Sequence, residues 1–215
     1  MSKAARAGAA ALIAGPVIGL IATIVLPTLS DDARDVVTAT TSHHSAMIAG
    51  LTLQTLSIPV MIAGVVWLAT ALAPKAPQLA VAGGIVGVAG AFVILFEDGL
   101  TDAGPSIVGS LDSARAVVAL HQVGSSTAAA IDPLALLFDL GVALLAFGAV
   151  KIGVSRWVAV ALTVSAVAQG VGFGAGARPV IAVAFAAMAV FFIVIVRSLS
   201  SAEQWQPAQS AVAVA

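Results

Sequence analysis

The segment Pro133-Leu-Ala-Leu-Leu-Phe-Asp139-Leu-Gly-Val-Ala-Leu-Leu-Ala-Phe-Gly-Ala-Val150 carries one charged residue in an otherwise apolar run. Its length approaches the roughly 20 apolar residues that an α-helix needs to cross a bilayer. In lipid every backbone polar group must be satisfied within the structure, and the continuous run does not alternate as a barrel strand does. The segment therefore predicts a membrane helix. Asp139 is a candidate functional group, because ionisable residues are costly inside a membrane.

The whole chain has the composition of a multi-pass membrane protein. Of its 215 residues, 60% are hydrophobic and 9% are charged, whereas soluble domains carry about 25% charged residues. The formal net charge is −1, so there is no basic surface to suit nucleic acid, and we expect no nucleic-acid partner. Cysteine and tyrosine are absent, which excludes disulfides, thiolate metal sites and phenolic acid–base chemistry.

Apolar runs of spanning length recur along the chain. We expect an all-α polytopic membrane protein with six transmembrane helices, near residues 8–28, 46–72, 79–96, 133–150, 157–172 and 179–197. The first run is longer than the 7–15 apolar residues of a signal peptide, so it predicts an uncleaved helix. Residues 1–198 then form a single six-span domain in the lipid bilayer, and residues 199–215 form a flexible cytoplasmic tail.

The basic residues predict the orientation in the cytoplasmic membrane, because Lys and Arg are enriched in short cytoplasmic loops. With the N-terminus inside, the inner face holds Lys3, Arg6, Lys75, Lys151, Arg156 and Arg197. The outer face then holds only Arg34, Arg115 and Arg178. Both termini are therefore expected in the cytoplasm.

Residues 113–131 are helix-like but weakly apolar. A single helix from 114 to 150 would be about 55 Å long, too long for a bilayer. We therefore expect a short outer interfacial or partly re-entrant helix before the fourth span. Asp132 and Pro133 predict the start of that span, as an N-cap followed by proline at the first helical position.

Small residues predict close contacts between helices. The spacing of Gly15 and Gly19, and of Gly83 and Gly87, lets two helix backbones approach each other. Gly83 and Gly87 are also candidates for a contact in a homo- or hetero-oligomer. The alternating glycines between 170 and 176 predict fraying at the end of the fifth span.

The polar residues of the spans converge at one depth under this topology. Gln54 and Gln169 lie in the outer halves of the second and fifth spans, Glu97 ends the third, and Asp139 lies in the fourth. They predict a shared, outward-facing pocket for a small solute, an ion or a proton, with Asp139 as the titrating group. The alternative is structural: a protonated Asp139 hydrogen-bonded across the bundle, with the two glutamines joining helices.

Other chemistry would use residues at the same level. Imidazole and carboxylate groups from His44, His121, Glu97 and Asp139 are candidate ligands of a divalent metal, and the two histidines are candidate haem ligands. Glu97 and Asp139 also fit an acid–base pair in a membrane-embedded enzyme that acts on a lipid ligand. A structural or accessory membrane subunit without chemistry is the remaining alternative.

Several short motifs follow one another along the chain in an order that is also found in other membrane proteins. The first span ends at Leu26-Pro27, an acidic outer loop follows, His44-Ser-Ala-Met opens the second span, and the third ends in Phe96-Glu97-Asp98-Gly99. In these features the chain resembles a family of uncharacterised actinobacterial-type multi-pass integral membrane proteins. The resemblance covers most of residues 8–198 in layout and carries over Pro27, His44 and Glu97. It implies a multi-pass helical fold and brings no activity with it.

Overall fold

The computed structural model describes residues 2–27, 32–123 and 129–205, and these ranges contain helices and short connections without strands. The helices are α1 (Lys3–Val25), α2 (Ala33–Ser42), α3 (His44–Leu72), α4 (Pro77–Ser110), α5 (Ser113–Val123), α6 (Ala129–Val150), α7 (Arg156–Gly174) and α8 (Arg178–Trp205). Six of them, α1, α3, α4, α6, α7 and α8, are long and apolar enough to cross a membrane. This confirms the predicted all-α, six-span class.

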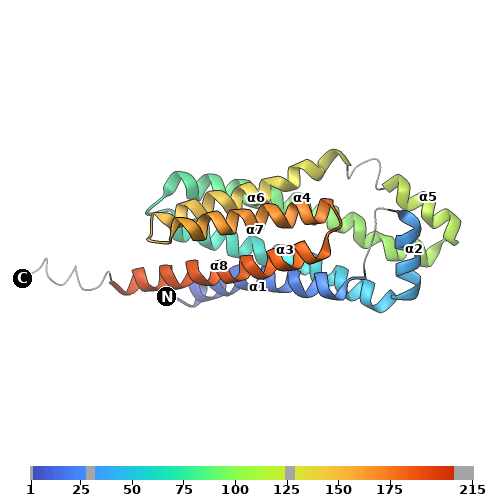
Figure 1. Ribbon diagram of the computed structural model, residues 1–215, viewed down its shortest axis with the longest axis horizontal. Coiled ribbons are helices and arrows are strands. Elements are labelled where there is room, and N and C mark those ends of the chain that lie inside the picture. The colour runs from blue at the N-terminus through green and yellow to red at the C-terminus, as the bar shows by residue number, and fades with distance from the viewer. Residues whose placement is uncertain (1, 28–31, 124–128, 206–215) are drawn as a thin grey trace, which may run out of the picture.

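The six long helices form a bundle in which chain neighbours are also neighbours in space. α1 packs on α3, α3 on α4, α4 on α6, α6 on α7 and α7 on α8, and α8 returns to α1. The bundle is therefore a closed ring, with a further contact between α3 and α6. Figure 1 shows the start of α1 and the end of α8 at one end of the bundle, and α2 and α5 at the other. We call these the terminal end and the cap end.

The outer surface of the bundle is apolar. Between 28% and 44% of the most apolar window of each span is buried inside the chain, so most of these residues face outward. Ile24, Ile85 and Val183, for example, are at least 67% exposed. Apolar surface of this extent suits lipid rather than water. The apolar interior includes Phe138, Leu162 and other side chains that are almost fully buried.

Glycines set the distance between α4 and α6. A Cβ added at Gly141 would lie 2.2 Å from the Cα of Gly87, and one added at Gly90 would lie 2.0 Å from the backbone nitrogen of Phe138. The two backbones are therefore in direct contact, as small residues permit. Gly83 and Gly87 are buried in this contact within the chain. Their face of α4 is occupied by α6 within the chain, and the contact with another subunit stays a prediction.

The α1–α8 contact closes the ring and is held by an arginine. The Arg178 guanidinium donates hydrogen bonds to the carbonyl oxygens of Thr23 and Ile24, the latter at 3.2 Å. These carbonyls belong to the last turn of α1, where helix carbonyls lack intrahelical partners and the helix dipole favours a cation. Gly19 of α1 lies against the Phe185 ring of α8. Gly19 thus makes a close contact between helices, with an aromatic side chain and not with the backbone that the spacing predicts.

Two short helices lie at the cap end. α5 is the predicted additional helix, although residues 124–128 of the predicted segment lie outside the described residues. α2 was not predicted, because its sequence is mostly polar and only Val37 and Thr40 are buried. Its N-cap is Asp32, whose carboxylate accepts a hydrogen bond of 2.8 Å from the backbone nitrogen of Arg34. α2 packs on α3, α4 and α5, which joins the cap to the bundle.

Two helices extend past their predicted ends. α4 continues to Ser110, well beyond the expected end at residue 96, and α8 continues to Trp205, into the segment expected to be a flexible tail. The expected bounds are those of the apolar runs. A helix satisfies its own backbone hydrogen bonds, however, so it can continue past the lipid into water. Residues 206–215 of the expected tail lie outside the described residues.

Two other expectations about helix ends are also wrong. α6 begins at Ala129, so Asp132 is not its N-cap and Pro133 lies inside the helix. Proline has no N–H, so the hydrogen bond that position 133 would donate to the Ala129 carbonyl oxygen is missing. α7 remains helical to Gly174 and does not fray at Gly170. Gly170 lies instead against side chains of α6, and Gly172 lies against α8. Close packing therefore explains why both positions are glycine.

Candidate functional site

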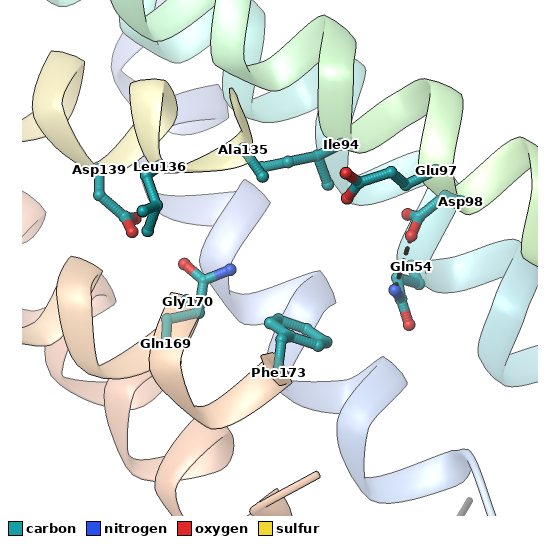
Figure 2. A pocket seen from close by; sticks show the side chains of 10 residues that line it. All are labelled: Gln54, Ile94, Glu97, Asp98, Ala135, Leu136, Asp139, Gln169, Gly170 and Phe173. Carbon is teal, nitrogen blue, oxygen red and sulfur yellow. Dashed lines mark hydrogen bonds between the residues drawn. The ribbon is translucent and has the colours of Figure 1, made fainter. Parts of the chain in front are cut away.

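A cavity of about 420 Å³ lies between α3, α4, α6 and α7. This volume is within the roughly 300–1,000 Å³ typical of small-molecule sites. The polar residues lining it are Gln54, Glu97, Asp98, Asp139 and Gln169, and the others are Ile94, Ala135, Leu136, Gly170 and Phe173 (Figure 2). All four residues that the sequence placed in a shared pocket, Gln54, Glu97, Asp139 and Gln169, therefore line one cavity.

The cavity extends along the bundle from its middle toward the cap end. Asp139 is eleven residues from Val150, about 16 Å from the terminal end of α6 at the helical rise. Asp98 is 21 residues from Pro77, about 31 Å from the terminal end of α4. The hydrocarbon core of a bilayer is about 30 Å thick. If the terminal-end loops lie at one surface, Asp139 is near the midplane and Asp98 is near the opposite surface.

Asp139 projects from α6 toward α7 and is 6% exposed. Its carboxylate rests against the backbone of Gly170, where an added Cβ would lie 2.7 Å from Oδ2. Any other residue at position 170 would occupy space that the carboxylate now uses. Within the described ranges, Asp139 has no hydrogen-bond or ion-pair partner. The predicted structural alternative, a hydrogen bond across the bundle, is thus not seen among these residues.

Gln169 is the second buried polar group of the cavity that lacks a partner. It is 5% exposed, and its Oε1 atom accepts no hydrogen bond among the described residues. Figure 2 shows its amide directed into the cavity, between Asp139 and the region of Glu97 and Asp98. Leaving such a group unsatisfied costs about 1–3 kcal/mol. An oxygen held at this cost and directed into a cavity is available to a ligand.

The end of the cavity nearest the cap carries two adjacent carboxyls on α4. Gln54 of α3 donates a hydrogen bond of 2.8 Å from Nε2 to Oδ1 of Asp98. Asp98 lies beyond residue 96, the expected end of the third span, yet it is 7% exposed and part of the bundle interior. Figure 2 shows the Glu97 side chain beside Ile94, on the wall that leads toward Ala135.

Sequence reasoning missed six of the ten lining residues. Asp98 was hidden because the third span was expected to end before it. A signal for it was present, since Ala91, Ile94 and Asp98 are spaced by three and four residues and so share one helix face. Gly170 and Phe173 belong to the glycine-rich stretch that was interpreted as frayed.

The two candidate histidine ligands lie outside the cavity. His44, at the start of α3, and His121, near the end of α5, are exposed and do not line the cavity. Among the residues that the structure describes, no three His, Asp or Glu side chains come together in a way that could hold a metal ion. The arrangement considered for metal or haem, histidines beside the carboxylates, is therefore not formed.

The cavity has an acidic lining. Three of its described lining residues are acids, and none is Lys, Arg or His. Such a lining attracts cations, and a low-dielectric surrounding strengthens the attraction. Comparisons with protein-family models, with curated proteins and with solved structures found no match to the chain. The function is therefore inferred from the cavity itself.

Proposed function

We propose that this is a multi-pass protein of the cytoplasmic membrane that takes a cation, either a small cationic solute or a proton, into the cavity between α3, α4, α6 and α7. In this proposal both termini are cytoplasmic and the cap end faces outward. The distribution of Lys and Arg supports the orientation, because six of the nine fall at or near the terminal end and three toward the cap end.

The observation that carries the proposal is the pair of buried polar groups at the cavity, Asp139 and Gln169, for which the described part of the chain provides no hydrogen-bond partner. A carboxylate near the membrane midplane is costly unless it is paired or protonated. Since no basic side chain lines the described cavity, the compensating charge has to come from outside the chain. A bound cation or proton supplies it, and the Gln169 oxygen adds a second acceptor.

The position of the other acids supports entry from the cap end. Asp98 and Glu97 lie between Asp139 and that end, so a cation entering there meets carboxyls before it reaches the midplane. Rings and clusters of acids select cations in membrane pathways. The predicted lipid-modifying enzyme has no comparable support, because no partnered acid–base pair is formed by Asp139 and a neighbouring group.

The test is transport into liposomes by the purified protein. Proton entry is followed with an internal pH-sensitive dye and sodium entry with a radioactive tracer, under an imposed membrane potential. Asp139→Asn removes the charge with little change of shape, and we expect it to abolish uptake while the protein remains folded. Asp112→Asn is the matched control, because Asp112 is an exposed carboxyl that pairs with Arg115 on the cap.

Two results would contradict the proposal. One is an Asp139→Asn protein that transports as fast as the Asp112→Asn control. The other is an Asp139→Leu protein that is more stable and fully functional in cells. Replacing a buried polar group by an apolar one can stabilise a protein when the polar group has only a structural role. The second result would identify an accessory subunit without chemistry.

A further inference from the structure

The size of the cavity is informative about the ligand. One water occupies about 30 Å³ in the liquid, so a volume of about 420 Å³ holds many waters. A bare metal ion needs several oxygen ligands at about 2.0–2.6 Å, and no suitable group of three His, Asp or Glu side chains occurs in the described ranges. The space therefore suits an organic molecule better than a bare ion.

Carboxyls stand at both ends of the cavity. Asp139 occupies the deep end and Asp98 and Glu97 the end nearest the cap (Figure 2). From the depths given above, the backbones of Asp139 and Asp98 lie about 15 Å apart along the bundle. Asp98 can accept further bonds beside the one from Gln54, because a carboxylate has about four lone-pair sites. The site thus offers anionic groups at two separated points.

The wall between these ends is apolar. Ile94, Ala135 and Leu136 line it, and the Phe173 ring adds an aromatic surface. Phe173 is 41% exposed and is held edge-on by Phe185, with ring centroids 6.2 Å apart and an interplanar angle of 80°. An aromatic face attracts organic ammonium groups. Hydrocarbon would contact this wall while charged groups reach the two ends.

We propose that the ligand of this cavity is a linear organic cation with an ammonium group at each end and a short hydrocarbon body between them. The proposal rests on the proposed function and names its substrate class. One ammonium group donates to Asp139 and to the Gln169 oxygen. Gln169 is 5% exposed, and its Oε1 accepts no hydrogen bond from the residues that the structure describes. The other ammonium donates to Asp98 and Glu97.

The probe is 1,4-diaminobutane, added to the purified protein in detergent at constant ionic strength. Binding is measured by calorimetry and by the shift in melting temperature. We expect saturable binding, no binding of the neutral 1,4-butanediol, and at least tenfold weaker binding of butylamine. Tenfold corresponds to about 1.4 kcal/mol, close to the lower end of the range for one hydrogen bond to a charged group.

Two variants place the binding in this cavity. Asp139→Asn should weaken the diamine at least tenfold. Gly170→Ala should weaken it as well, because the new methyl group takes the space beside the Asp139 carboxylate. Gly109→Ala is the matched control, since an added Cβ at that position meets nothing within 4 Å, and it should bind like the wild type. If Gly170→Ala fails to fold, Asp139→Asn still decides the question.

The outcomes separate this inference from the proposed function. Binding of the diol or of sodium chloride as strong as that of the diamine would overturn the inference, as would diamine binding that Asp139→Asn leaves unchanged. If the diamine does not bind but Asp139-dependent uptake of protons or sodium persists in liposomes, only the substrate class is wrong. If neither binding nor uptake depends on Asp139, both proposals fail.

Discussion

Replacing Gly90 by alanine should push α4 and α6 apart. An added Cβ would lie 2.0 Å from the Phe138 nitrogen and 2.7 Å from the carbonyl carbon of Leu137, whereas ordinary contact begins at 3.4 Å. The shortest contact must therefore lengthen by 1.4 Å, the difference between 3.4 Å and 2.0 Å. Both obstacles are backbone atoms, which cannot turn aside as the end of a side chain can. Overpacking typically costs about 1–3 kcal/mol, and we expect the upper part of that range.

The control for this prediction lies on the same helix. Gly109→Ala adds the same methyl group where nothing lies within 4 Å, so only the gain in helix propensity remains, up to about 1 kcal/mol. Thermal unfolding in a fixed detergent should place Gly90→Ala about 5–10 °C below the wild type, at 2–4 °C per kcal/mol. Gly109→Ala should melt at or above the wild type. Equal melting of the two variants would refute the direct backbone contact between α4 and α6.

Three further substitutions test other contacts by the same measurement. Arg178→Gln removes the cation from the last turn of α1 and should lower the free energy of unfolding by about 1–2 kcal/mol. A loss of stability no larger than that of the exposed Arg115→Gln would contradict the stabilisation of the α1 carbonyls by Arg178. Gln54→Leu removes the 2.8 Å bond to Asp98 and should cost about 1–3 kcal/mol, an effect that should vanish in the Asp98→Leu background. Phe138→Ala empties a side-chain site that is 1% exposed and should cost about 3–5 kcal/mol; a cost below 1 kcal/mol would show that the core closes around the gap.

The spans could be predicted from the sequence because lipid imposes both a length and an apolar composition. The ends of the helices could not, since a helix needs no lipid to continue. α4 shows this most clearly, as it runs through Asp98 and on to Ser110. The ten residues of α2 escaped prediction for a related reason: a short polar helix is held by contacts with other elements, which its own sequence does not reveal.

The candidate site was predictable in part. Polar residues within apolar spans are rare, so Gln54, Asp139 and Gln169 were evident, and their similar depth placed them together. The closeness of Asp139 to Gly170 could not be predicted, because it depends on how α6 and α7 are rotated toward each other. The same limit applies to Gly83 and Gly87, whose spacing predicts close packing but does not identify the partner helix.

The closed ring of helices has a consequence for how the chain is assembled in the membrane. Each long helix up to α8 packs on the long helix that precedes it, so it meets a partner as soon as it is inserted. α1 is different, because one of its sides stays open to lipid until α8 arrives at the end of synthesis. The cavity lies between α3, α4, α6 and α7, so all of its walls are present before the ring closes. A ribosome releasing the chain just before α8 would therefore leave the cavity walls in place and a single lateral seam between α1 and α7, which α8 supplied as a separate polypeptide should close.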